Sequence, residues 1–128
     1  MKVLALLIVA GVLLLVVPHC FNMFGGMPHT TTVALFVRQS MKTSLTAFNR
    51  DIGRYPTTEE GLAALSTCPS GAETRWRGPY VDVLPADPWG RLYQYLSPAA
   101  KSDQGYDLWS LGADGITSAD DIGNWQNS

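Results

Sequence analysis

Basic residues are scarce at both ends of this sequence. Lys2 is the only charged side chain before Arg38, and no lysine or arginine follows Lys101. A protein that binds nucleic acid replaces phosphate counterions with a stripe or patch of basic side chains, and this chain has none. We therefore exclude nucleic-acid binding and expect no nucleic-acid partner.

Histidine and cysteine are also scarce. No histidine follows His29, whereas a nucleophile–base pair for hydrolysis would need one in the C-terminal part. We therefore expect no enzymatic activity. His19, Cys20 and His29 lack the further ligands that a soft-metal site needs. Cys20 and Cys68 lie in regions of different character, so we interpret them as two independent thiols rather than a disulfide.

Residues 3–17 form an unbroken apolar run, VLALLIVAGVLLLVV. As a helix this run would cover only ~22 Å of the ~30 Å hydrocarbon core. The uncharged residues that follow Pro18, as far as Phe24, would complete a span, because a membrane helix tolerates proline as a kink. We predict a single-pass transmembrane anchor at residues 1–26, with Lys2 on the cytoplasmic side. The alternative is a cleaved signal peptide, although no A-x-A-like cleavage site follows the run.

Apolar side chains recur every three or four residues from 33 to 52. This spacing predicts an amphipathic helix with one face packed against a sheet. Residues 30–32 are threonines that could cap its start, and Gly53 and Pro56 predict its end. The apolar positions are Val33, Val37, Met41, Leu45, Phe48 and Ile52.

Shorter elements follow the predicted helix. Thr57 and Glu60 have the spacing of a capping box, which predicts a short helix through about Leu65. Short β-rich runs separated by a proline-bounded turn then predict an antiparallel sheet of about three strands, and so an α+β domain at residues 27–128. The three predicted strands are residues 80–84, 91–96 and 106–111.

Acidic side chains and glycines are concentrated between residues 110 and 125, SLGADGITSADDIGNW. Asp114 lies between two glycines, and the pair Asp120 and Asp121 follows a five-residue loop. Calcium takes six to eight oxygen ligands from carboxylates, carbonyls and water, but the spacing is not that of an EF-hand. From these residues alone, a metal site and an ordinary Asp-rich surface turn both remain open.

Three blocks of the sequence, in this order, resemble the periplasmic domain of the major pseudopilin of bacterial type II secretion. The resemblance extends over about residues 43–125. It implies a pilin-like α+β fold, in which half of a long N-terminal helix is the membrane anchor and half packs on a small sheet. The blocks are RYPTTEEGLAAL (54–65), WRGPYVDVLPADPWGRLYQYLSP (76–98) and YDLWSLGADG with ADDIGNW (106–125).

The resemblance also implies location and function. It places the chain in the bacterial inner membrane, with the domain at 27–128 in the periplasm. It implies a structural subunit of the pseudopilus, a homo-oligomeric helical fibre that drives protein export through the outer membrane. The expected partners are other pseudopilins and the inner-membrane secretion platform. The alternative function is a non-polymerising, membrane-anchored pilin-like binding or adaptor protein.

By the same resemblance, the C-terminal loop holds a calcium ion. Asp114, Asp120 and Asp121 would supply carboxylates, and Leu111 a backbone carbonyl. The loop between the GADG and DIGNW blocks is shorter than in the family. Which aspartate of the pair binds, and whether Thr117 or Ser118 adds an oxygen, therefore stays open. We expect a structural calcium that neutralises the carboxylates and ties the loop to the sheet.

The N-terminus departs from the family pattern. The family's leader glycine and the phenylalanine and glutamate that follow the cleavage site are missing, whereas GVLLLVVP (11–18) resembles the later part of the family's apolar helix. We expect either that the true start lies upstream of Met1 or that the chain is an unprocessed variant. A chain without the glutamate would lack a charge that pairs with a neighbouring subunit in the membrane.

Overall fold

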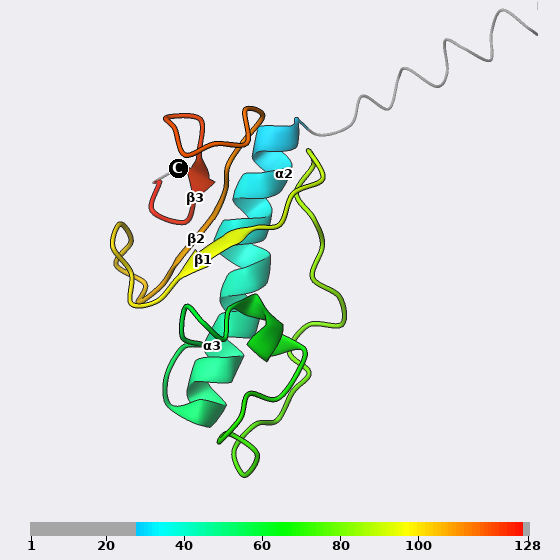
Figure 1. Ribbon diagram of the computed structural model, residues 1–128, viewed down its shortest axis with the longest axis vertical. Helices are drawn as coiled ribbons and strands as arrows, with labels where there is room; N and C mark the ends of the chain where they lie inside the picture. Colours follow the sequence, from blue (N-terminus) through cyan, green and yellow to red (C-terminus); the bar gives the residue numbers. More distant parts are fainter. Residues whose placement is uncertain (1–27, 127–128) are drawn as a thin grey trace, which may run out of the picture.

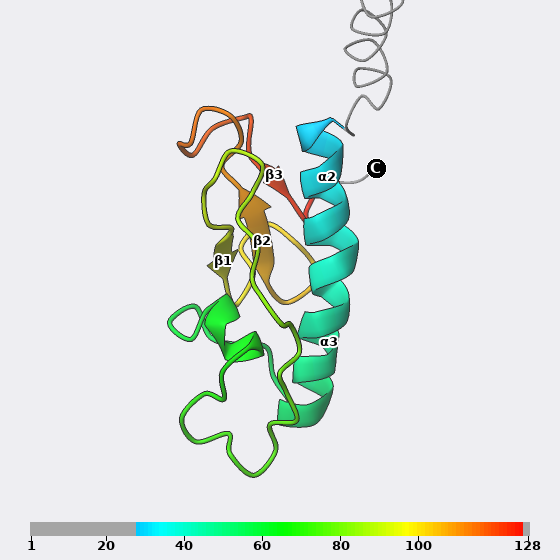
Figure 2. The same cartoon turned by 90° about the vertical axis from the view of Figure 1, so that its right-hand side faces the viewer.

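The computed structural model describes residues 28–126 of the chain, so the predicted anchor at 1–26 lies outside the described residues. The described part has two layers, a helical rod on one side and a small sheet with its loops on the other (Figures 1 and 2). No helix within residues 28–126 is long and apolar enough to cross a membrane.

The helical rod is built from three consecutive segments, α2 (His29–Leu35), the π-helical η1 (Phe36–Ser40) and α3 (Met41–Ile52). Its first apolar steps are all four residues long, more than the 3.6 residues of an α-helical turn. The i→i+5 bonds of a π-helix make a wider turn, which keeps these side chains on one face. The rod ends at the left-handed Gly53, as predicted. All six predicted core positions are buried: Val33, Val37, Met41, Leu45, Phe48 and Ile52.

The predicted threonine cap at residues 30–32 is wrong. The helix begins at His29, Pro28 occupies the N-cap position, and no side chain of the described residues caps the start. The proline ring fixes the extended backbone that precedes the helix, so the threonines fall inside the first turns. There the Thr32 hydroxyl donates back to the Pro28 carbonyl at 3.3 Å.

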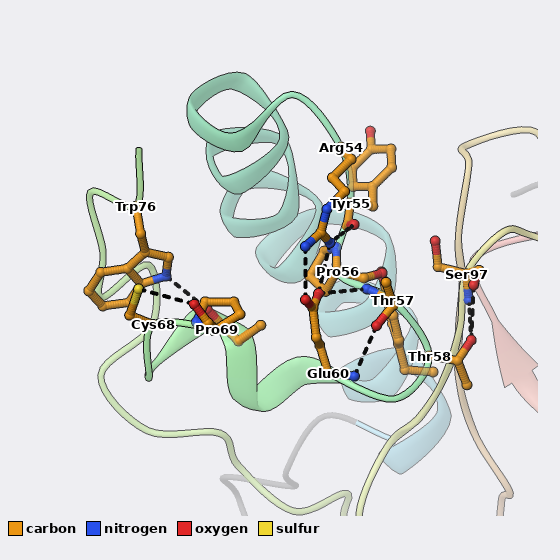
Figure 3. A network of polar contacts seen from close by, with 12 residues as sticks. Arg54, Tyr55, Pro56, Thr57, Thr58, Glu60, Cys68, Pro69, Trp76 and Ser97 are labelled. Atoms are coloured by element: carbon orange, nitrogen blue, oxygen red, sulfur yellow. Dashed lines mark hydrogen bonds and ion pairs between the residues drawn. The ribbon is translucent and has the colours of Figure 1, made fainter. Parts of the chain in front are cut away.

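The predicted capping box is present. The Thr57 N–H donates to Glu60 Oε2 at 2.9 Å, and the Glu60 N–H donates to Thr57 Oγ1 at 3.1 Å. Arg54 holds the Glu60 carboxylate with two hydrogen bonds of 2.8 Å (Figure 3). The predicted helix through Leu65 is not continuous, because Gly61 has a backbone φ of 60°. Only a 3₁₀ turn, η2 (Leu62–Leu65), follows it.

The sheet has three antiparallel strands, as predicted, in the order β1 (Gln94–Leu96), β2 (Asp107–Ser110) and β3 (Ile122–Gly123). In register, Tyr95 lies opposite Leu108 and Ser110 lies opposite Ile122. Two of the predicted strands, 91–96 and 106–111, are therefore present in shortened form. Leu108 and Tyr106 are buried against the helix together with Leu65.

The prediction of a strand at residues 80–84 is wrong. Pro79 and Pro85 flank this segment and cannot donate to a ladder. The N–H groups of Tyr80 and Val81 both donate to the Leu65 carbonyl, at 2.7 and 3.4 Å, so the segment pairs with a turn instead of a strand.

The third strand of the sheet is instead β3, a two-residue element that the sequence pattern did not predict. The Asn124 side chain just after it accepts from the Leu108 N–H and donates to the Tyr106 carbonyl, both at 3.0 Å. These two bonds attach the end of the chain to the central strand β2.

The two cysteines are not both described. Cys68 lies on the loop after η2 as a half-buried free thiol, and burial raises its pKa. Its Sγ contacts the Pro69 carbonyl at 3.5 Å (Figure 3). Cys20 lies outside the described residues, so the prediction of two independent thiols stays a prediction.

Candidate calcium site in the C-terminal loop

The site is supported by a tight turn at residues 87–91. Asp87 is only 4% exposed, and its Oδ1 accepts the N–H groups of Trp89 at 3.1 Å and Arg91 at 2.8 Å. Its Oδ2 accepts the hydroxyl of Ser110, at the end of β2, at 2.7 Å. The Ser110 oxygen in turn accepts the Gly112 N–H at 3.1 Å. The turn therefore fixes the point at which the acidic loop leaves the sheet.

The acidic loop, residues 111–121, connects β2 to β3 near the α2 end of the molecule, in orange to red in Figure 1. Its two ends lie close together because Ser110 and Ile122 are paired in the sheet. A Cβ atom added to Gly112 would lie 2.6 Å from the Asp120 carbonyl oxygen, which leaves room only for glycine. The loop is thus a closed turn with several oxygen atoms in a small space.

Ser118 connects three of the predicted metal-binding residues. Its hydroxyl donates to Asp114 Oδ2 at 2.8 Å, and its N–H donates to Asp121 Oδ1 at 3.3 Å. The same hydroxyl oxygen accepts the Asp120 N–H at 3.2 Å. Leu111 is half-buried at the start of the loop, whereas Asp120 is exposed. The structure therefore places Ser118, rather than Thr117, among the carboxylates.

Asp121 is the carboxylate best suited to a cation. It is 4% exposed, and its Oδ2 is buried without a hydrogen-bond partner among residues 28–126. A buried carboxylate oxygen with no partner is costly, and a bound cation would satisfy it. Across the same residues, no three acidic, histidine or cysteine side chains converge on one point. A calcium ion here would therefore also need hydroxyl or carbonyl oxygens, which calcium accepts.

The charge state of Asp114 suits the same role. The hydrogen bond from Ser118 holds the pKa of this carboxyl below its usual range, and the Ile116 N–H and the charge of Arg91 act in the same direction. Asp114 is therefore ionised at neutral pH and is available as a charged oxygen ligand.

Residues 29–125 match the family model for protein G of the type II secretion system. The chain belongs to this family. It is 38% identical to the type II secretion system core protein G of Klebsiella pneumoniae, over 98% of this chain and 90% of that protein. It is 41% identical to the core protein G of Pseudomonas aeruginosa, over 75% of this chain and 71% of that protein.

A solved structure also matches this protein G family member. The crystal structure of the major pseudopilin from the type 2 secretion system of enterohaemorrhagic Escherichia coli superimposes with a TM-score of 0.67 at 38% identity. The match covers 78% of this chain and 87% of that chain. It confirms the pilin-like α+β fold that the sequence predicts.

Sequence reasoning missed two supporting residues of the site. Asp87 and Ser110 belong to different sequence blocks, and their contact becomes visible only when the turn packs on β2. The sequence DPWG predicted a turn, but an aspartate at the start of a turn ordinarily bonds its own backbone. Only the burial of Asp87 distinguishes it from such a surface residue.

Proposed function

We propose that this chain is a pseudopilin, a structural subunit of the type II secretion pseudopilus, anchored in the inner membrane with its domain in the periplasm. The match to a solved major pseudopilin over most of both chains carries the proposal. Its partners would be further copies of the chain, other pseudopilins and the inner-membrane secretion platform. The role is structural, in keeping with the family.

The helical rod offers a surface for assembly. The sheet covers only one of its faces (Figure 2). The opposite face is exposed and forms a shallow groove of about 630 Å³. Small side chains such as Thr46 and Ala47 in this groove would let a second helix approach closely. The groove is lined by Arg38, Gln39, Lys42, Thr43, Thr46, Ala47 and Arg50.

Assembly can be tested in cells that have a type II secretion system but lack its own protein G. We expect this chain to form fibres visible by electron microscopy and a ladder of formaldehyde-linked oligomers. Thr46→Glu, in the exposed groove, should abolish both without changing the melting temperature. Thr67→Glu is the matched control, because Thr67 is also exposed but lies off the helix. A chain that restores secretion while remaining monomeric would favour the adaptor alternative.

We further propose that the acidic loop binds a calcium ion through the Leu111 carbonyl and the carboxylates of Asp114, Asp120 and Asp121. These three carboxylates do not converge among the described residues, so they would draw together around the ion. The buried Oδ2 of Asp121, which has no hydrogen-bond partner in the part of the chain that the structure describes, supports a cation at this place. Ser118 supports it too, because this residue holds Asp114 and Asp121 together. The chemistry of the ion would be electrostatic. It would neutralise carboxylates that otherwise repel one another and would stabilise the loop against the sheet.

Chelation followed by a melting scan tests the calcium proposal. At a calcium concentration of about 100 times Kd, binding adds about 2.7 kcal/mol, equivalent to roughly 10–20 °C in a domain of this size. Wild-type protein should lose this increment in EDTA and regain it with calcium. Asp121→Asn and Asp114→Ala should respond to neither. Asp103→Asn, an exposed acid outside the loop, should behave like wild type. A wild-type transition that calcium and EDTA leave unchanged would refute the site.

A further inference from the structure

We propose that Arg91 is a positioning residue of the acidic loop, whose guanidinium holds the first turn of that loop in its metal-binding shape before any metal is present. The inference rests on the calcium site proposed above. It concerns a side chain outside the predicted ligand set, on a different loop of the fold.

The guanidinium of Arg91 is attached to the loop by two hydrogen bonds. Nη1 donates to the Gly112 carbonyl at 2.8 Å, and Nη2 donates to the Ala113 carbonyl at 3.4 Å. The planar fork of arginine suits two neighbouring acceptors in a way that the single ammonium of lysine does not. Two consecutive peptide groups of the loop are thereby held by one side chain.

The backbone of Arg91 is itself fixed. Its N–H donates to Asp87 Oδ1 at 2.8 Å, and its carbonyl accepts the Asp87 N–H at 2.8 Å. Asp87 also holds Ser110 at the start of the loop. The guanidinium therefore reaches the loop from a rigid turn. The carboxylate of Asp87 holds both the backbone of Arg91 and the hydroxyl of Ser110, from which the loop starts.

The loop also fits closely around the guanidinium. A Cβ atom added to Gly115 would lie 2.5 Å from Arg91 Cζ and Nε, and Gly115 has a φ of 71°. The backbone conformation at this position favours glycine, and a side chain here would displace the guanidinium. Arg91 thus lies against the loop at Gly112, Ala113 and Gly115.

This arrangement divides the oxygen atoms of the loop into two groups. The carbonyls of Gly112 and Ala113 face Arg91. The Leu111 carbonyl and the carboxylates remain for the metal. The two hydrogen bonds from Arg91 therefore order the first turn of the loop without calcium.

Two effects of Arg91 on calcium affinity oppose each other. A positive charge near the site repels calcium, so its removal alone would tighten binding. An ordered loop spares calcium the entropy cost of ordering it, so loss of that order would weaken binding. We expect the ordering effect to be the larger one, because the guanidinium binds two loop carbonyls, the backbone of Arg91 is fixed by Asp87, and the loop packs closely on the guanidinium at Gly115. Loss of charge-assisted hydrogen bonds of this kind corresponds to about a tenfold weaker Kd.

The test measures the calcium Kd of the full chain in mild detergent by titration calorimetry. Arg91→Gln should weaken binding about tenfold. Arg91→Lys should remain close to Arg91→Gln, because it restores the charge but not the fork. Arg77→Gln, which removes an exposed arginine outside the loop, should bind like wild type. Unchanged or tighter binding by Arg91→Gln overturns the inference, as does full recovery with lysine.

Amide hydrogen exchange supplies a second readout, which reports the order of the loop directly and does not depend on calcium affinity. Without calcium, Arg91→Gln should exchange faster than wild type at residues 111–121 but equally at 41–52, and calcium should restore the protection. Equal exchange in the loop of both proteins would contradict the inference. If Arg91→Gln does not fold, Arg91→Lys, which keeps the charge and the aliphatic stem but not the fork, takes its place and should weaken binding about as much. Wild-type protein that binds no calcium would refute the metal site itself, and with it this inference.

Discussion

The buried carboxylate of Asp87 offers a quantitative test of how the turn at 87–91 supports the loop. Asp87→Ala removes the acceptor of three donors, the N–H groups of Trp89 and Arg91 and the hydroxyl of Ser110. With Asp87 only 4% exposed, water replaces these bonds poorly. Each buried donor left without a partner costs about 1–3 kcal/mol. Because Trp89 and Arg91 are half-buried, we expect a total loss near the low end, about 2–4 kcal/mol.

The matched control is Asp87→Asn. Asparagine keeps Oδ1 as an acceptor for the two backbone N–H groups but replaces the oxygen that accepts from Ser110. The loss should be about 1 kcal/mol.

Urea unfolding of the full chain in mild detergent, followed by tryptophan fluorescence, measures both losses. The midpoint should fall in the order wild type, Asn, Ala, with an unchanged slope. An alanine variant within about 0.5 kcal/mol of wild type, the usual range for an unremarkable surface change, would refute the reasoning. An asparagine variant as unstable as alanine would show that the bond to Ser110 alone matters.

Two further predictions concern the sheet and the helix. Burial raises the pKa of Asp107, but the backbone N–H groups of residues 100–102 outweigh it and hold this pKa below the ordinary 3.8. The stabilisation by Asp107 is therefore complete above pH 3.8 and disappears as pH falls through the lowered native value. Between about pH 6 and about pH 3, wild type should lose more unfolding free energy than Asp107→Asn in denaturant titrations; parallel curves would contradict this. Phe48→Ala, at a fully buried position, should cost about 3–5 kcal/mol in urea unfolding, whereas Thr46→Ala on the exposed face should cost less than about 0.5 kcal/mol.

The sequence was sufficient to predict the helix face because that pattern is local. Residues 33–52 repeat with a helical period whatever the rest of the chain does, and every predicted core position is buried. The start of the helix was not predictable in the same way. Proline and threonine both favour a helix start, and the extended backbone at Pro28 decided the choice in this chain.

The sheet was predicted in number and direction of strands but not in composition. Residues 80–84 are rich in residues that favour strands, yet the N–H groups of Tyr80 and Val81 donate to the Leu65 carbonyl, which lies close in space. Residues 122–123 have no strand signature of their own. They pair with β2 because Asn124 binds residues that lie 16 and 18 positions earlier. Such contacts depend on packing, which the sequence of either segment alone does not encode.

The candidate site was predicted by residue type but not by arrangement. Ser118 links the carboxylates of two of the four predicted ligands, Asp114 and Asp121, whereas it binds Asp120 only through the backbone N–H. The supporting turn at 87–91 and the guanidinium of Arg91 belong to another sequence block. Their contact with the loop depends on tertiary packing, which a motif within one block does not reveal.

The attachment of the chain's last described residues has a consequence for biosynthesis. Arg38, in the first part of the helix, donates to the Gly123 carbonyl at 3.5 Å and to Gln126 Oε1 at 3.4 Å, across more than 80 residues of sequence. Contacts of such high sequence separation form late in folding. The helix therefore finds these partners only after the whole domain has left the ribosome. We expect a chain that ends before Ile122 to lack β3 and this attachment, and to be cleaved by proteases faster than the full chain.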